Sequence, residues 1–380
     1  MRWLLITFLV IGANAQDLSE RIRSAQSAGN YDGAAKLYSE LIASGSDAPE
    51  ARSNYGVMLH LAGKNREALE QFRIALRAKP TLDAANLFAG LAELDLGEPK
   101  LALPYLKRVR NADASKPAPL LALAKAQAAL RQYDLANEDY RKAADLDGSL
   151  AEAWYGLGVT DRSLAEELLN RAARRGEKNP ANQERVHTLL DDALKALTRA
   201  LELDPGSART HLVMAESLSD SGKFAEAVAE YQSALKLDPR LEAASLGLAS
   251  QYWKQRQFDQ AVPLLQQVLR TTPKDPEANG MMADIVQHAG RDSEAKRYAE
   301  VALAGNPDLI ETRVVLARIY VDMQEPKQAI LELKKVIAAD PDGSYHFLLY
   351  RAYRQAGDEE SAKSALARSQ EIRKGAAAQP

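Results

Sequence analysis

The sequence predicts an all-α protein, a right-handed superhelical solenoid of about ten helical hairpins, one of which carries an extended hairpin insertion. Three observations support this. An alanine recurs every 34 residues along most of the chain. Apolar residues around each of these alanines lie three or four positions apart, which places them on one stripe of a helix. Only 6% of the 380 residues are aromatic, and small core side chains suit helices whose axes approach to about 8–10 Å.

The period is clearest in residues 222–239. Phe224, Ala227 and Tyr231 share one helical stripe there, and Pro239 ends the helix because it has no N–H to donate. The alanines in register with this segment are Ala34, Ala68, Ala102, Ala136, Ala193, Ala227, Ala261, Ala295, Ala329 and, one residue early, Ala362. Self-similarity at a fixed period predicts repeats that stack in one array.

Residues 1–15 predict a secretory signal peptide. Arg2 provides the positive start, an apolar run follows, and Ala-Asn-Ala forms a small-residue cleavage site. We expect the mature chain to begin at Gln16 and to be exported, to the periplasm or outside the cell. A retained membrane anchor is the alternative, although the apolar run is shorter than the roughly 20 residues that span a bilayer. No later segment is predicted to cross a membrane.

Composition excludes several classes of function. The chain has no cysteine, which excludes a lipoprotein anchored through cysteine, disulfide bonds, thiol catalysis and zinc held by thiolates. The formal net charge is −3. A nucleic-acid-binding protein needs a basic surface that displaces counterions, so no nucleic-acid partner is expected.

The repeats follow one another with a single interruption. After the signal peptide we expect repeats over residues 16–160, an extended hairpin insertion over 161–191, further repeats over 192–375, and a frayed tail over 376–380. Within each repeat, a small residue on the first helix allows close approach of the second. These small residues are Gly56, Gly90, Ala124, Gly158, Ala215, Ala249, Ala283 and Ala317.

Other positions of the repeat are equally regular. A bulky residue on the second helix packs opposite the small one. A glycine at the turn between the helices supplies a left-handed conformation, and a proline ends the second helix. The turn glycines are Gly29, Gly63, Gly97, Gly222, Gly290 and Gly357; the prolines are Pro80, Pro205, Pro239, Pro273, Pro307 and Pro341. This pattern resembles the tetratricopeptide repeat (TPR), of the exported bacterial type, over nearly all of the mature chain. The resemblance implies a scaffold that binds proteins.

The insertion is expected to project as a finger. The alanine period resumes at Ala193, 23 residues late. Apolar residues continue the first helix beyond 161, a Gly- and Pro-containing segment at 176–182 breaks it, and a second helix leads back. The tip of the finger is locally basic and is one candidate partner-binding surface, with Arg171, Arg174, Arg175, Lys178 and Arg185.

A second candidate surface is a groove. The resemblance implies that the first helices of the repeats line the concave face of the array. An apolar row in register falls on these helices, so we expect a groove that takes an amphipathic helix or an extended peptide. The alternative is that the row is ordinary packing between repeats. The candidate groove residues are Leu87, Leu91, Leu121, Tyr155, Leu212, Leu246 and Trp253.

No pattern for catalysis, a cofactor or a phosphate loop is found. His187 and Asp191 are four residues apart and could face one side of a helix, but two ligands are too few for a metal site. The sequence therefore predicts a non-catalytic scaffold or adaptor in the periplasm or cell envelope. Two alternatives stay open. One is a role in exopolysaccharide assembly, secretion or carbohydrate binding, in which Trp253 and Tyr155 stack on sugars. The other is recognition for an enzyme whose catalytic domain is on another chain.

Overall fold

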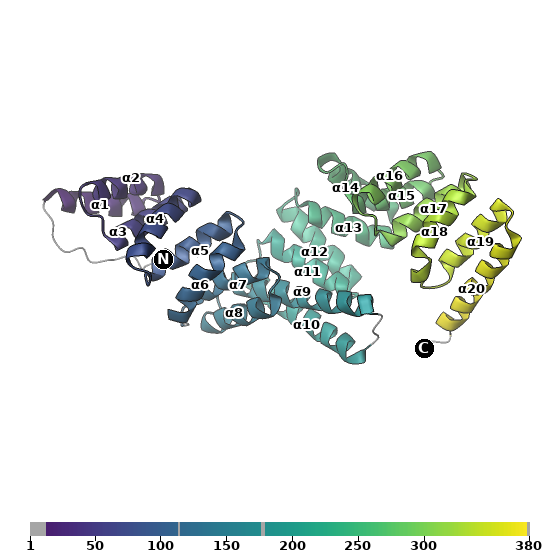
Figure 1. Ribbon diagram of the computed structural model, residues 1–380, viewed down its shortest axis with the longest axis horizontal. Helices are drawn as coiled ribbons and strands as arrows, with labels where there is room; N and C mark the ends of the chain where they lie inside the picture. Colours follow the sequence, from purple (N-terminus) through teal and green to yellow (C-terminus); the bar gives the residue numbers. More distant parts are fainter. Residues whose placement is uncertain (1–12, 113–114, 176–178, 378–380) are drawn as a thin grey trace. The chain divides into compact units, whose positions relative to one another are not determined.

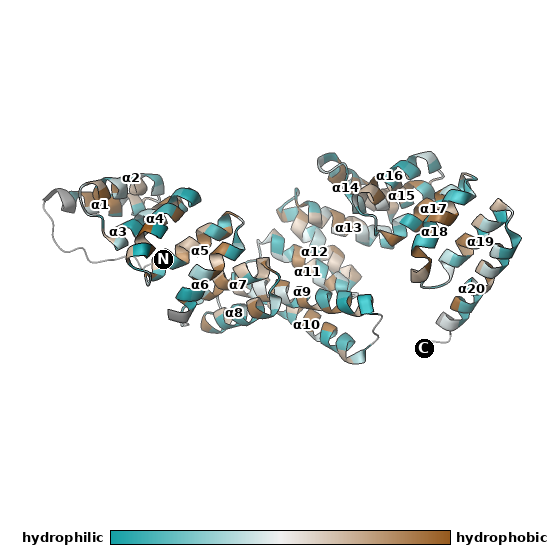
Figure 2. Cartoon of the chain, viewed as in Figure 1, coloured by the Kyte–Doolittle hydropathy of each residue, from teal (hydrophilic) through white to brown (hydrophobic). Residues whose placement is uncertain are grey.

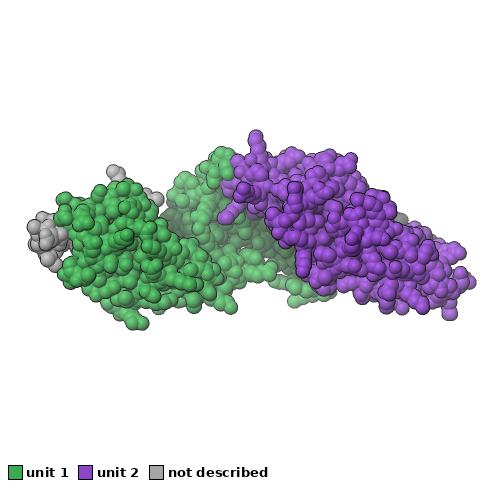
Figure 3. Space-filling view, turned by 90° about the horizontal axis from the view of Figure 1, so that it is seen from above, with its two compact units in different colours: residues 1–206 green, residues 207–380 purple. Residues whose placement is uncertain are grey.

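The computed structural model describes residues 13–112, 115–175 and 179–377, and these form twenty α-helices, one short 3₁₀-helix and no strand. The all-α prediction is confirmed. The chain divides into two compact units, residues 1–206 and 207–380 (Figure 3). The predicted signal peptide lies outside the described residues except for its last three residues.

Unit 1 contains ten helices (Figure 1). They are α1 (Ala13–Ser27), α2 (Tyr31–Ala43), α3 (Pro49–Leu61), α4 (Asn65–Ala78), α5 (Asp83–Asp95), α6 (Pro99–Ala112), α7 (Pro117–Ala129), α8 (Tyr133–Leu146), α9 (Ala151–Arg175) and α10 (Pro180–Leu203).

Unit 2 contains the other helices of the described residues. They are α11 (Ala208–Asp220), α12 (Phe224–Leu237), α13 (Glu242–Lys254), α14 (Phe258–Thr271), α15 (Pro276–His288), α16 (Asp292–Gly305), α17 (Ile310–Asp322), α18 (Pro326–Val336), η1 (Ile337–Ala339), α19 (Ser344–Ala356) and α20 (Glu359–Ala377). Helix α20 extends two residues into the segment predicted to be a frayed tail.

Each odd-numbered helix packs against the even-numbered helix that follows it, and within each unit the contacts among the described helices join pairs that are adjacent along the chain. We call the odd-numbered helices A helices and the even-numbered ones B helices. Most helices carry both hydrophobic and hydrophilic residues (Figure 2), as expected of amphipathic helices that bury one face. Every alanine of the 34-residue ladder is at most 1% exposed.

Small residues on the A helices face bulky residues on the B helices. A Cβ built on Gly56 would lie 2.5 Å from the Phe72 ring, and one on Gly158 would lie 2.4 Å from Leu197. Heavy atoms do not approach this closely, so only glycine fits at these positions without displacing the B helix. The packing of small against large residues predicted from the sequence is therefore present.

The turns between A and B helices contain a left-handed residue, as predicted. All six predicted turn glycines have positive φ, between 68° and 78°. Where the sequence has no glycine at this position, other residues adopt the same conformation: Arg131, Arg256 and Gln324, with φ of 57° to 61°. This conformation costs a non-glycine residue about 1–2 kcal/mol, so the turn geometry is imposed by the packing of the helices on each side.

A recurring hydrogen bond ties the start of an A helix to the preceding loop. In four repeats, the side chain at one fixed position donates to the backbone carbonyl six residues earlier. The donors are Asn86, Trp154, Asn279 and Arg313, the acceptors are Pro80, Gly148, Pro273 and Pro307, and the distances are 2.6–3.1 Å. The bond satisfies a carbonyl that the end of the B helix would otherwise leave to solvent.

The extended hairpin is formed by α9 and α10, which have 25 and 24 residues, whereas neighbouring helices have 13 or 14. The extension has its own small core of Ala165, Val186, Leu189 and Leu190, with Leu164 and Leu168 packed against it. It thus buries apolar surface between its two helices. Within the described ranges, none of the helices is long and apolar enough to span a bilayer.

Asp161 is buried where the extension begins, and its side chain accepts a 2.7 Å hydrogen bond from Asn137 Nδ2. Burial raises the pKa of Asp161 to about 6, although the charge of Arg141 and the bond from Asn137 act in the opposite direction. Removal from water penalises the ionised carboxylate more than these two groups stabilise it. A carboxyl group that keeps its proton to a higher pH than an exposed aspartate therefore lies at the base of the finger.

Candidate functional site

The seven candidate groove residues all lie on A helices and are all half-buried. Unit 1 holds four of them, and unit 2 holds Leu212, Leu246 and Trp253. In unit 1, Leu87 and Leu91 pack against a cluster that includes Leu106 and Leu123. Part of the row in unit 1 therefore contributes to ordinary packing.

The other two unit 1 candidates lie on the next A helices. Leu121, on α7, packs against a cluster that contains Tyr140 and Leu157. Tyr155, on α9, interacts with at least one other residue of the chain. These contacts leave only part of each side chain exposed for a partner.

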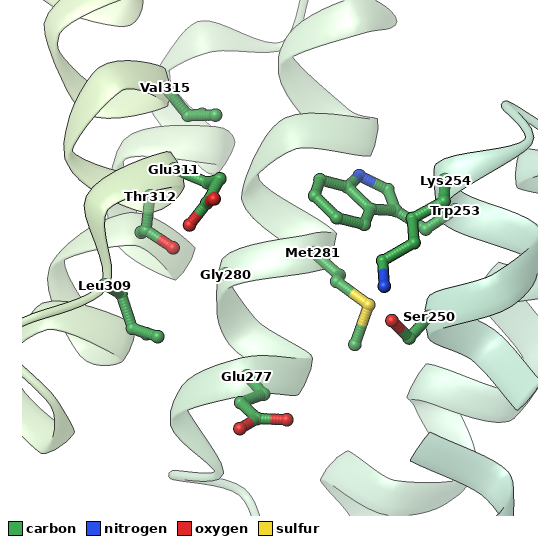
Figure 4. A pocket seen from close by; sticks show the side chains of 10 residues that line it. All are labelled: Ser250, Trp253, Lys254, Glu277, Gly280, Met281, Leu309, Glu311, Thr312 and Val315. Atoms are coloured by element: carbon green, nitrogen blue, oxygen red, sulfur yellow. The ribbon is translucent and has the colours of Figure 1, made fainter. Parts of the chain in front are cut away.

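Unit 2 has a pocket of about 230 Å³ between three successive A helices, α13, α15 and α17. Trp253 is the one candidate groove residue that lines it. Figure 4 shows side chains of α13 on one side of the pocket and side chains of α17 on the other, with α15 between them. The lining residues are Ser250, Trp253, Lys254, Glu277, Gly280, Met281, Leu309, Glu311, Thr312 and Val315.

The pocket lies where the apolar row is interrupted. Leu212 and Leu246 are 34 residues apart, and the next position in that register is Gly280. A Cβ at Gly280 would lie 2.5 Å from Thr312 Oγ1 of the next A helix. Because a glycine stands where the two preceding repeats have leucine, no side chain from this position occupies the pocket.

One wall of the pocket is held by a buried carboxylate. Trp253 donates from Nε1 to Asp284 Oδ2 at 2.9 Å, which fixes the plane of the indole ring. Asp284 is 6% exposed. Arg318 of the next A helix lies 3.3 Å from Asp284 Oδ1, and Arg256 and His288 lie 3.8 and 3.4 Å from the same carboxylate.

This ion network continues along the A helices of unit 2. Arg318 also donates to Gln287 Oε1 at 3.3 Å, and Gln287 donates to Asp322 Oδ2 at 3.1 Å. Asp322 in turn pairs with Arg351 of α19 at 3.3 Å. The network links α13, α15, α17 and α19 through polar contacts beside the apolar pocket, and so supports the helices that line it.

The finger presents its basic residues to solvent. Arg171, Arg174, Arg175 and Arg185 are all exposed, while Lys178 lies outside the described residues. His187 and Asp191 do face one side of α10, with Nε2 and Oδ2 3.6 Å apart. Over the described part of the chain, no three His, Asp or Glu side chains converge as metal ligands do.

Sequence comparison identifies the repeats. Family models described as tetratricopeptide repeat match residues 20–83 and 62–118, and also 189–246, 218–285 and 287–350. Together they cover more than half of the chain. The chain belongs to the tetratricopeptide repeat family. TPR proteins generally mediate protein–protein interactions, and their fold is generally a non-catalytic scaffold. The matches leave out residues 119–188, which include most of the finger.

Solved structures similar to this TPR chain include PilF of Pseudomonas aeruginosa, at 19% identity over 61% of this chain and 95% of that one, with a TM-score of 0.48. YrrB, described as a TPR protein with an unusual peptide-binding site, is 19% identical over 56% of this chain and 97% of that one, with a TM-score of 0.43. Yeast Tom70 is 18% identical over 94% and 92% of the two chains, with a TM-score of 0.39. No curated protein matches the sequence.

Proposed function

We propose that this TPR protein is a non-catalytic scaffold that binds a peptide or helix of a partner protein on the A-helix face of unit 2, with the pocket beside Trp253 as its centre. The observation that carries the proposal is this pocket between α13, α15 and α17. Concave sites lined by apolar side chains, with a few polar groups at fixed positions, are where proteins bind ligands.

The pocket has the features that peptide recognition needs. Trp253, Met281 and Val315 supply apolar surface that a partner side chain would cover. Ser250 and Thr312 supply hydroxyl groups at the same site. Because the indole ring of Trp253 is fixed by its bond to Asp284, little side-chain entropy is lost when a partner packs on it, which favours binding.

Carbohydrate binding is the second candidate, and the exposed part of Trp253 in the pocket favours it. An indole face presents apolar surface on which a sugar ring could stack. An oligosaccharide would then compete with any partner that occupies the pocket. Tyr155, the other aromatic residue named for this role, lies in unit 1 and is not among the pocket residues.

Photo-crosslinking in the source cell tests the proposed surface. With p-benzoylphenylalanine in place of Ser250, we expect a discrete protein adduct that disappears when Trp253 is changed to alanine, because the partner loses the apolar wall on which it packs. The same probe in place of Ala229, an exposed residue of α12, should give no adduct. If the probe in place of Arg174 gives an adduct and the probe in place of Ser250 gives none, binding is assigned to the finger instead.

We further propose that the protein is exported and acts in the periplasm or at the cell surface. The support is the arrangement of Arg2, the apolar run and the Ala-Asn-Ala site. Expressed in a bacterium with a general secretion pathway, the chain should fractionate outside the cytoplasm, and N-terminal sequencing should begin at Gln16. Changing Ala15 to a bulky residue such as tyrosine should block cleavage. Cytoplasmic protein that retains Met1 would refute the proposal.

A further inference from the structure

We infer that the pocket of unit 2 selects a peptide segment in which a bulky apolar residue stands next to a lysine or arginine. This inference rests on the proposed function and specifies its ligand. Two features of the pocket carry it. The first is the space left by Gly280, and the second is the set of charges at the edge of the pocket.

The space beside Gly280 is the reason to expect a bulky apolar residue in the ligand. In the two preceding repeats of unit 2, the side chain at this position is leucine. At Gly280 the side chain is missing, and a pocket of about 230 Å³ is present instead, with Trp253, Met281 and Val315 around it. A large aliphatic or aromatic side chain from a partner would fill the place that leucine takes elsewhere, and burial of its apolar surface would drive binding.

Two carboxylates at the pocket are the reason to expect a basic residue in the ligand. Glu277 of α15 and Glu311 of α17 line the pocket and are exposed. Neither forms an ion pair with any residue in the described part of the chain. Figure 4 shows the Glu311 carboxylate directed toward the space between the helices. A cation on a ligand seated in the pocket would therefore meet two carboxylates that form no ion pair within the described ranges.

A lysine on the opposite side of the pocket disfavours a second basic residue in the ligand. Lys254 of α13 lines the pocket on the side of Trp253 and Ser250, and it too has no ion-pair partner in the described ranges. A second cation on that side of the ligand would be repelled. The nearby Arg256 and Arg318 are engaged by Asp284. The pocket should thus prefer one basic residue beside the apolar residue over a uniformly basic peptide.

The test uses synthetic hexapeptides of serine and alanine that carry one Phe next to one Lys, in both orders. Matched peptides replace Lys by Glu, replace Phe by Ala, or place Lys on both sides of Phe. Binding to the full chain is measured by calorimetry. Binding to a chain that begins at Gln16 and carries Trp154→Phe is measured by the fluorescence of Trp253, which is then its only tryptophan. We expect the better Phe–Lys order to bind at least about fivefold more tightly than its Glu counterpart, because opposite and like charges each contribute modestly at an exposed edge.

Variants locate the effect. The double variant with Glu277→Gln and Glu311→Gln should bind the Phe–Lys and Phe–Glu peptides equally well. It should still bind them more tightly than the peptide in which Phe is replaced by Ala. Glu300→Gln, on the exposed surface of α16, is the matched control and should keep both the preference for Lys over Glu and the preference for Phe over Ala. Gly280→Leu should fill the pocket and abolish binding of all the peptides. Its fold is checked by circular dichroism because the new side chain must displace Thr312 Oγ1.

The outcomes separate this inference from the proposed function. If the Phe peptides bind regardless of charge, or if the Glu peptide binds better, the selection inferred here is wrong and peptide binding stands. If no peptide binds and Ser250 gives no crosslinked adduct, the proposed function fails as well. A preference for Lys that survives the double glutamine variant would also overturn the inference, since the two carboxylates would not be its source.

Discussion

Replacing Asp284 with alanine should destabilise unit 2 by about 3 kcal/mol. Removal of one partner from a buried ionic cluster costs about 3–5 kcal/mol, because charges that remain lose their counter-ion. The lower end applies here because the Arg256 side chain is 61% exposed and can turn to water. The substitution also removes the acceptor of the Trp253 indole N–H, which leaves a half-buried donor without its partner.

Hydrogen exchange read by mass spectrometry shows where the loss falls. Peptides from α13, α15 and α17 should exchange faster in the variant, while peptides from unit 1 should be unchanged, because the residues of the network lie in unit 2. Asp284→Asn keeps an acceptor for Trp253 and should cost less. The control is Glu300→Ala, which removes one exposed negative charge from the same unit. An Asp284→Ala variant that exchanges like this control would contradict the role assigned to the network.

Replacing Asp161 with asparagine should change how the stability of unit 1 depends on pH. The folded-state pKa of this carboxyl is about 6, above its value of about 3.9 in an unfolded chain. The folded state therefore binds the proton more tightly, and the free energy of unfolding falls as the pH rises from about 4 to about 6. Above that range the ionised side chain costs up to about 3 kcal/mol, at 1.36 kcal/mol for each pKa unit.

Asparagine stays neutral at every pH and can still accept the hydrogen bond from Asn137. We expect the variant to gain about 1–2 kcal/mol at pH 7.5, less than the full 3 because its new amide donor needs a partner, and little or nothing at pH 4. The measurement is urea unfolding of a chain that begins at Gln16 and carries Trp253→Phe, so that Trp154 is its only tryptophan.

The control for this measurement is Asp145→Asn, an exposed carboxyl on α8. This substitution removes one exposed negative charge from the same unit and is measured over the same pH range. If the unfolding free energies of Asp161→Asn and its parent differ by the same amount at pH 4.5 and at pH 7.5, burial does not raise the pKa of this carboxyl as described.

The fold was largely predictable because it repeats. Each alanine of the ladder meets the same packing requirement in every repeat, so a single hairpin pattern predicts the others. The 23-residue interruption before Ala193 likewise predicted the long helices α9 and α10. The left-handed turns at Arg131, Arg256 and Gln324 could be expected only from their place in the period, since arginine and glutamine have no intrinsic preference for that conformation.

The candidate site was harder to predict. The apolar row on the A helices mixes residues that pack between repeats, such as Leu87, with residues that border open space, such as Trp253. Hydrophobic spacing alone cannot separate the two, because both fall on one wide stripe of a helix. The informative signal was the missing side chain at Gly280, which interrupts the row. The network around Asp284 joins four separate helices, and no local pattern shows such a combination.

Within each unit the described hairpins pack against hairpins adjacent to them along the chain, and this has a consequence for the gene. A hairpin that is copied or lost as a block of 34 codons brings or removes one whole layer, and the surfaces on each side still match because they follow the same small-against-large rule. The number of repeats can therefore change while each remaining hairpin keeps the same kind of hydrophobic core. The extended α9–α10 hairpin shows the other mode of growth, in which one layer lengthens outward and the period resumes behind it.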